Sequence, residues 1–353
     1  MRTLTEAEGR VIAVLLGSTP ASERERLTRM QVPRSTYHAA RKRAYEEGWL
    51  RDRYIPDPAR FGSPLATIAI VRPFADRVGD LANRLAADRA NVVAWVGAQS
   101  ALCVYFHSDR KVAEKTLGAL TSGGIASSVT SVIAQVDRSD VPVFFDYEGL
   151  WSHLSGLSGA ATYPNGLGGR VPAPEGDPPA ATPHQVWAAK ELVNRPFDAE
   201  ARGRGGHLIG PFGLPFSQQK LLRAGWVTYR VVLEPSLLPP YQGRSADQVV
   251  LISGRLRTGA RPEGLFAALT RDCRVFPFLY ATDGERVLMA ALGRAPGAPT
   301  GGPLPAIDAD RQPVMATLQG ALEGIEVQQE AVTQLRAVVD HRYERLFSPT
   351  VAR

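Results

Sequence analysis

A cluster of basic and hydrogen-bonding side chains lies between residues 34 and 53. Its first part contains Arg34, Arg41 and Lys42, and no acidic residue appears in it before Glu46. Arginine can bind guanine through two hydrogen bonds, and each phosphate that a cation neutralises releases counterions from DNA. These residue types therefore predict a surface that contacts double-stranded DNA. The candidate contacts are Arg34, Ser35, Thr36, Tyr37, His38, Arg41, Lys42, Arg51 and Arg53.

The residues around this cluster predict a helix that presents it to solvent. Val32-Pro33 interrupts the preceding segment, and Ser35 or Thr36 can cap the next helix by accepting hydrogen bonds from its first N–H groups. Gly48 can end the helix in a left-handed conformation, and the basic residues after it then lie on a short extended arm. Two further helical patterns precede the cluster. Residues 1–60 are therefore predicted to form a winged helix-turn-helix head, with the arm as its wing.

The hydrophobic period changes after this head, which predicts a second domain over residues 61–154. Short apolar runs alternate with amphipathic stretches in the order strand, helix, strand, strand, helix, strand. This βαββαβ order is that of a ferredoxin-like domain, in which two helices cover an antiparallel sheet. The predicted strands are 65–71, 92–97, 101–107 and 128–135, and the predicted helices are 76–88 and 111–120.

A winged head followed by a βαββαβ domain resembles the Lrp/AsnC (feast/famine) family of transcription regulators. The resemblance covers roughly residues 1–136 and includes the hairpin VVAWVGAQSALCVYF at residues 92–106. It implies that the head binds DNA and that the second domain assembles dimers and binds a small-molecule effector. The hairpin differs from the family pattern in one respect, because Gln99-Ser100-Ala101 stands where the family usually has Gly-Asp-Tyr.

The second half of the chain repeats the element order of the first. A Gly, Pro and Ala-rich stretch, residues 155–182, has the composition of a linker. Beyond it, residues 216–230 (FSQQKLLRAGWVTYR) echo residues 37–53, and each half closes on a similar motif, YEGLW at 147–151 and YERLF at 343–347. Landmarks that recur in the same order indicate tandem duplication. The chain is therefore predicted to be an α+β protein with a second, degenerate winged helix at 183–245 and a second ferredoxin-like domain with a C-terminal tail at 246–353.

The two predicted heads differ where DNA would bind. The recognition segment of the second head keeps only Lys220 and Arg223 as cations. Residues 197–216 contain many glycines and lack a helical period, which predicts a poor second helix there. We therefore expect asymmetric DNA binding, with the first head dominant.

Other classes of site have little support in the sequence. The six histidines lack the spacing of a metal site, and Cys103 and Cys273 cannot complete one. No glycine motif follows a strand as in nucleotide sites, and no Ser-His-Asp arrangement can be recognised, so we expect no catalytic residues, metal or cofactor. The net charge of +6 favours a polyanionic partner. The sequence shows no long apolar run and no signal peptide, which predicts a cytoplasmic protein that does not bind membranes. We also expect the protein to form a homodimer.

Two alternatives to a DNA-binding regulator follow from the same pattern. Siroheme decarboxylases resemble this architecture and occur as paired or fused subunits. This resemblance implies an enzyme that holds a tetrapyrrole. A winged helix can also present a solvated basic face while it binds another protein, which implies an interaction scaffold.

Overall fold

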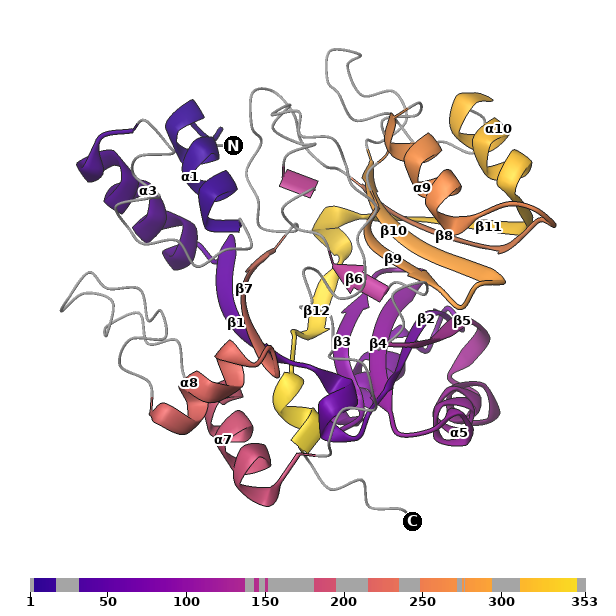
Figure 1. Ribbon diagram of the computed structural model, residues 1–353. Helices are drawn as coiled ribbons and strands as arrows, with labels where there is room; N and C mark the ends of the chain where they lie inside the picture. The colour runs from indigo at the N-terminus through magenta and orange to yellow at the C-terminus, as the bar shows by residue number, and fades with distance from the viewer. Residues whose placement is uncertain are drawn as a thin grey trace.

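The protein is an α+β molecule in which two winged heads lie beside two ferredoxin-like domains (Figure 1). The computed structural model describes residues 3–16, 32–136, 143–145, 150–151, 181–194, 215–234, 248–271, 275, 277–293 and 312–347. Residues 155–180 of the predicted linker (155–182), the helical pattern at 23–30 in the first head, residues 197–214 of the second head and Cys273 lie outside these residues.

The first head is built on helices α1 (Glu6–Leu16) and α3 (Arg34–Glu46). Thr5 and Glu8 cap α1 reciprocally, because Thr5 N donates to Glu8 Oε2 and Glu8 N donates to Thr5 Oγ1. The apolar faces of α1 and α3 pack around Trp49, which is 2% exposed. Gly48 follows α3 with a φ of 75°, so the left-handed helix end expected there is confirmed.

The start of α3 corrects one expectation. The N-cap of α3 is Pro33, and no side chain makes a capping hydrogen bond there. Ser35 and Thr36 lie inside the first turn of the helix rather than before it. Proline has no N–H and a fixed φ, so the break at Pro33 starts the helix without a hydroxyl cap.

The arm after α3 is a strand, β1 (Leu50–Pro56), which pairs antiparallel with β7 (Val227–Leu233) of the second half. The wing is therefore shared between the heads rather than folded on its own head. Arg53 lies directly opposite Arg230 at the centre of this two-stranded ribbon. The second head, α7 (Pro183–Val193) and α8 (Phe216–Arg223), lies at the other end of the ribbon from α1 and α3 (Figure 1).

The first ferredoxin-like domain follows the predicted βαββαβ order. A short helix, η1 (Pro58–Phe61), connects it to the ribbon. Its sheet has the strand order β12-β3-β4-β2-β5, and Arg345 donates to Asp88 O and Asn91 O beside it. The bounds are β2 (Leu65–Pro73), α4 (Val78–Ala87), β3 (Asn91–Val96), β4 (Ala101–His107), α5 (Arg110–Ser122) and β5 (Ala126–Gln135).

The second ferredoxin-like domain has the same order, with its sheet arranged β11-β8-β10-β9-β6. Its elements confirm the predicted ferredoxin-like order. The bounds are β8 (Gln248–Leu256), α9 (Pro262–Arg271), β9 (Pro277–Thr282), β10 (Arg286–Gly293), α10 (Gln312–Ala321) and β11 (Leu322–Ala331). The segments after it are η3 (Val332–Gln334), β12 (Arg336–Val339) and η4 (Tyr343–Phe347).

The two halves exchange their last strands. β6 (Val143–Phe145), which follows the first domain in sequence, pairs with β9 of the second, and β12, which follows the second domain, pairs with β3 of the first. The inner faces of the two sheets share one apolar core, in which the rings of Trp95 and Phe278 lie 5.7 Å apart. The two domains therefore share a core, and each half of the chain contributes a strand to the sheet of the other half.

The two closing motifs dock on the heads. Trp151, fully buried, donates from Nε1 to Gly9 O of α1 over 3.0 Å. In the second half, the Phe347 ring contacts the Phe61 ring edge to face at 5.0 Å, and η4 lies against α7. Each tail therefore fastens a head to the paired domains.

Candidate functional site

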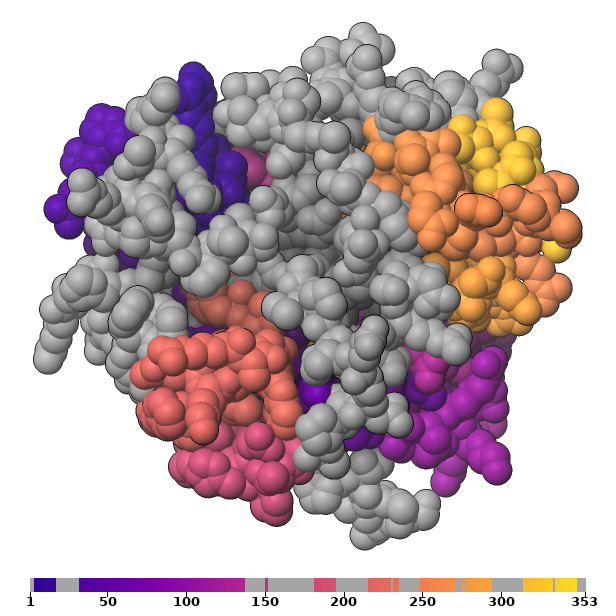
Figure 2. Space-filling model, in the orientation of Figure 1, coloured from indigo at the N-terminus to yellow at the C-terminus, as the bar shows by residue number. Residues whose placement is uncertain are grey.

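The solvent face of α3 carries most of the predicted DNA contacts. Arg34, Ser35 and Lys42 are exposed, and His38 and Arg41 are half-buried on the same side of the helix. Arg34 Nε lies 3.3 Å from His38 Nε2, and Lys42 Nζ lies 3.7 Å from Glu46 Oε1. Both spacings are those of helical neighbours four residues apart, so the side chains form one row along the helix. Figure 2 shows this head, in indigo, apart from the salmon second head.

The structure corrects the role of Tyr37. Its side chain is fully buried between α1 and α3, on the face that also buries Ala40 and Ala44. A side chain in that position cannot reach a base edge. Tyr37 is therefore a core residue, and Thr36 beside it is half-buried.

Arg43 joins α3 to α1. Its Nη1 lies 2.6 Å from Glu8 Oε1, and the Glu8 side chain is only 5% exposed. An ion pair with one buried partner has a fixed geometry, and its loss leaves a charge without compensation. Arg43 and Glu8 hold the two helices of the first head together.

Arg51 and Arg53 lie on β1 and bind the second half of the chain. Both guanidinium groups pair with Asp340 Oδ2, with Arg53 Nη2 at 2.9 Å, and His341 Nδ1 lies 2.7 Å from Asp340 Oδ1. Burial raises the pKa of Asp340, but the hydrogen bond to His341 and the charges of His341, Arg53 and Arg51 outweigh it and hold that pKa well below its usual value. Asp340 is thus a charged partner for both arginines, and their contact with phosphate stays a prediction.

The second head presents a different surface. Lys220 and Arg223 are exposed on α8, but two large apolar side chains are exposed too, Phe216 of α8 at 67% and Trp187 of α7 at 57%. Lys220 Nζ lies 5.2 Å from the centre of the Phe216 ring. The surface of the second head is therefore partly apolar.

A carboxylate site that the sequence did not reveal lies at the turn between β3 and β4. Glu330 of β11 accepts hydrogen bonds from Ala98 N and Gln99 N at 2.9 Å and from Ser100 Oγ at 2.7 Å. A Cβ on Gly97 would lie 2.4 Å from Glu330 Oε2, so only glycine leaves room for this carboxylate. In the sequence, Gly97 indicates that another group approaches the backbone closely here, but a glycine does not show which residue that is. The hairpin that the family resemblance associates with an effector thus holds a side chain of the same protein.

The described residues hold neither a metal-binding cluster nor a membrane-spanning helix. They contain no group of three His, Cys, Asp or Glu side chains placed to hold a metal ion. Among them there is also no helix with the length and apolar character needed to span a membrane.

Paired heads on a shared ribbon, with exchanged strands below them, define this chain as a fused pair of winged-helix and ferredoxin-like units. No protein-family model matches the sequence, and no curated protein is significantly similar to it. Solved structures similar in fold include regulators and an enzyme. AsnC from E. coli is 13% identical over 38% of this chain and 93% of its own, with a TM-score of 0.30.

Two further structures extend this comparison. An AsnC family transcriptional regulator from Agrobacterium tumefaciens is 10% identical over 37% of this chain and 90% of its own, with a TM-score of 0.31. The siroheme decarboxylase NirDL, in complex with an iron-uroporphyrin III analogue, is 10% identical over 97% of both chains, with a TM-score of 0.44.

Proposed function

We propose that this protein is a sequence-specific DNA-binding regulator that reads DNA mainly through α3 of the first head. The observation that carries the proposal is the row of Arg34, His38, Arg41 and Lys42 along the accessible face of one helix. Cations concentrated on one helix face are the electrostatic footprint of a major-groove reader. Ser35, exposed in the first turn, adds a hydrogen-bonding group at the helix start, which is the end that such helices present to base edges.

The arrangement of the heads supports asymmetric binding. The heads occupy opposite ends of the β1–β7 ribbon, as the half-sites of a dimeric reader require. The first head offers a thirteen-residue helix with a polar face, whereas α8 has eight residues and an exposed aromatic side chain beside Lys220. Lys220 and Arg223 then act as phosphate contacts that add affinity without reading bases. Arg51 and Arg53 contribute in the same way once phosphate competes with Asp340.

Three further features belong to the same proposal. The protein acts in the cytoplasm, two copies associate to present further heads, and a small-molecule effector modulates the affinity for DNA. Under this proposal the chain is a binding protein. A decarboxylase of the siroheme type is the alternative, and a direct test of tetrapyrrole binding separates the two.

The experiment measures DNA affinity against salt for the full chain. Fragments that the intact protein selects from genomic DNA are labelled and titrated by fluorescence anisotropy. Arg41→Ala with Lys42→Ala should weaken binding by at least about tenfold and lower the slope of log K against log salt by about 2. Lys220→Ala with Arg223→Ala should lower affinity less than the first pair does.

A matched control removes one arginine and one lysine elsewhere. Arg110 and Lys111 are both exposed at the start of α5, away from the heads, and their replacement by alanine should leave affinity unchanged. Absence of binding by the intact protein would overturn the proposal. Equal losses from the two head variants would overturn the asymmetry alone.

A further inference from the structure

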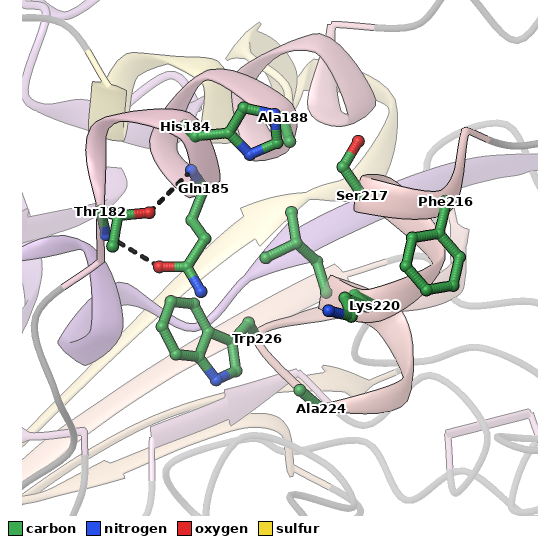
Figure 3. Close-up of a pocket in the computed structure, with 10 residues that line it drawn as sticks. Thr182, His184, Gln185, Ala188, Phe216, Ser217, Lys220, Ala224 and Trp226 are labelled. Carbon is green, nitrogen blue, oxygen red and sulfur yellow. Dashed lines mark hydrogen bonds between the residues drawn. The ribbon is translucent and has the colours of Figure 1, made fainter.

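The second head contains a cavity of about 550 Å³ between α7 and α8 (Figure 3). Its walls come from both helices and from Trp226, which follows α8. Figure 3 shows the Gln185 side chain pointing toward Trp226 across this space, with Phe216 and Lys220 on the α8 side. A cavity of this size suits a small organic molecule rather than a single ion.

The first head has an ion pair, Arg43–Glu8, at the position that corresponds to this cavity. The capping threonines Thr5 and Thr182 and the positive-φ glycines Gly48 and Gly225 are equally far apart in the chain, so the two heads correspond residue by residue. Gln185 caps α7 as Glu8 caps α1, because Gln185 N donates to Thr182 Oγ1 and Thr182 N donates to Gln185 Oε1. The correspondence also aligns Lys220 with Arg43 and Trp226 with Trp49.

Two substitutions separate the heads at the cavity. In the first head the Arg43–Glu8 ion pair joins the helices and Trp49 is buried beneath it. In the second head a neutral amide, Gln185, replaces the carboxylate, and Lys220 replaces the arginine. Trp226 is correspondingly half-buried and lines the cavity. The second head has lost the ion pair that closes the first.

The charge balance of the cavity follows from the same substitutions. Lys220 forms no ion pair with any residue that the structure describes, and its described contact is the Phe216 ring. The described lining residues include no aspartate or glutamate. A cation without an ion-pair partner among the described residues, together with aromatic side chains on the walls, favours a ligand with one negative charge and an apolar body.

Trp226 is held in place by two residues of η1. Arg60 Cζ lies 5.5 Å from the centre of its ring, and the Phe61 ring contacts it edge to face at 6.2 Å. Arg60 in turn lies 3.8 Å from Asp57 and is 8% exposed. A fixed indole face offers a preorganised stacking surface, which lowers the entropy lost when a ring binds.

We propose that this cavity of the second head binds small aromatic monocarboxylates, with the carboxylate at Lys220 and the ring against Trp226. The site lies in a head rather than in the paired domains, and it requires no DNA. It therefore goes beyond the function proposed above and can be tested separately.

The experiment titrates the full chain by calorimetry with three probes, 3-phenylpropionate, indole-3-acetate and 1-naphthoate, each beside its neutral amide. At least one acid should bind with one site per chain and more tightly than its amide, because the amide lacks the charge that Lys220 recognises. Absence of binding by all three acids at millimolar concentrations would overturn the proposal. Equal affinity for acid and amide would overturn it too.

Two variants locate the site. Lys220→Met keeps the length of the side chain and should weaken the acid by about tenfold, the value of one charge-assisted hydrogen bond, without weakening the amide. Gln185→Glu restores the carboxylate of the first head and keeps the capping box, so it should abolish binding of the acid by pairing with Lys220.

The matched control is Arg223→Met, which removes the neighbouring exposed cation of α8 that does not line the cavity. It should bind the acid as the parent protein does. An equal loss from Lys220→Met and Arg223→Met would show a diffuse charge effect and overturn the assignment. Thermal unfolding identifies any variant that has lost its fold, and Gln185→Glu, which keeps the capping box of α7, then decides the outcome. Unchanged binding of the acid by this variant would overturn the proposal.

Discussion

Replacing Glu330 by glutamine should destabilise the contact between the two halves of the molecule. Glu330 is 2% exposed on β11 of the second domain, yet its three hydrogen-bond donors lie on the β3–β4 turn of the first. Glutamine has nearly the same shape, so the substitution tests the charge and the acceptor atoms rather than the packing.

The expected loss follows from the three bonds. A hydrogen bond to a charged group contributes about 1.5–3 kcal/mol, and the glutamine oxygen keeps one or two of them in weaker, neutral form. The amide nitrogen then faces backbone N–H groups and cannot accept from them. Because the three bonds share one carboxylate, their losses do not add, and we expect about 2–4 kcal/mol in the free energy of unfolding.

The assay is urea unfolding followed by tryptophan fluorescence and far-ultraviolet circular dichroism. Glu323→Gln is the control, because Glu323 is exposed on the same strand and its replacement should change stability by less than about 0.5 kcal/mol. The slope of the transition should stay constant in both variants. A loss for Glu330→Gln no larger than that of the control would refute the assignment of this carboxylate as a bond between the halves.

Three further predictions address other parts of the molecule. Burial lowers the pKa of His107 from 6.5 to about 4, so the unfolded chain takes up its proton first, and stability that is complete above pH 6.5 should fall by up to about 3 kcal/mol as the pH drops toward 4. Thermal unfolding of His107→Gln should lose that part of the pH dependence, and an unchanged profile would contradict it. Trp151→Phe removes the hydrogen bond to Gly9 O and part of a buried ring, so it should cost about 1–3 kcal/mol and should increase protease cleavage in the first head before the paired domains are cut. Incubation with siroheme followed by gel filtration should leave the protein without tetrapyrrole absorbance, and a stoichiometric bound pigment would favour the enzyme alternative instead.

The local structure could be predicted from the sequence where residue type dictates backbone geometry. Gly48 and Gly225 end their helices with positive φ, and the short apolar runs between amphipathic stretches after Pro58 indicate the βαββαβ domain. Tyr37 was misassigned because the basic stretch was judged by residue type and not by helix face. Tyr37, Ala40 and Ala44 recur at helical spacing, which places all three on the buried side.

The contacts between the halves could not be predicted in the same way. The alternation of residues in β1 indicates a strand but does not indicate its partner, and any strand edge satisfies the same backbone groups. The pairing of β1 with β7, the exchange of β6 and β12, and the position of Glu330 each join residues far apart in the chain. Residue type identifies Arg51 and Arg53 as cations that can contact DNA. Only the fold shows that Arg51 and Arg53 face Asp340.

The ribbon shows what one continuous chain permits that two identical chains do not. Asp52 accepts a hydrogen bond from Tyr229 Oη at 2.9 Å, and the correspondence between the heads makes these two the same position of the repeat. Two identical subunits would place aspartate against aspartate there, or tyrosine against tyrosine, because a symmetric interface presents the same residue twice. This acid–phenol pair is therefore asymmetric about the axis, which no pair of equivalent residues in a homodimer can be. Because the two halves belong to one chain, this asymmetric pairing forms at any protein concentration. One head can therefore specialise while the other diverges.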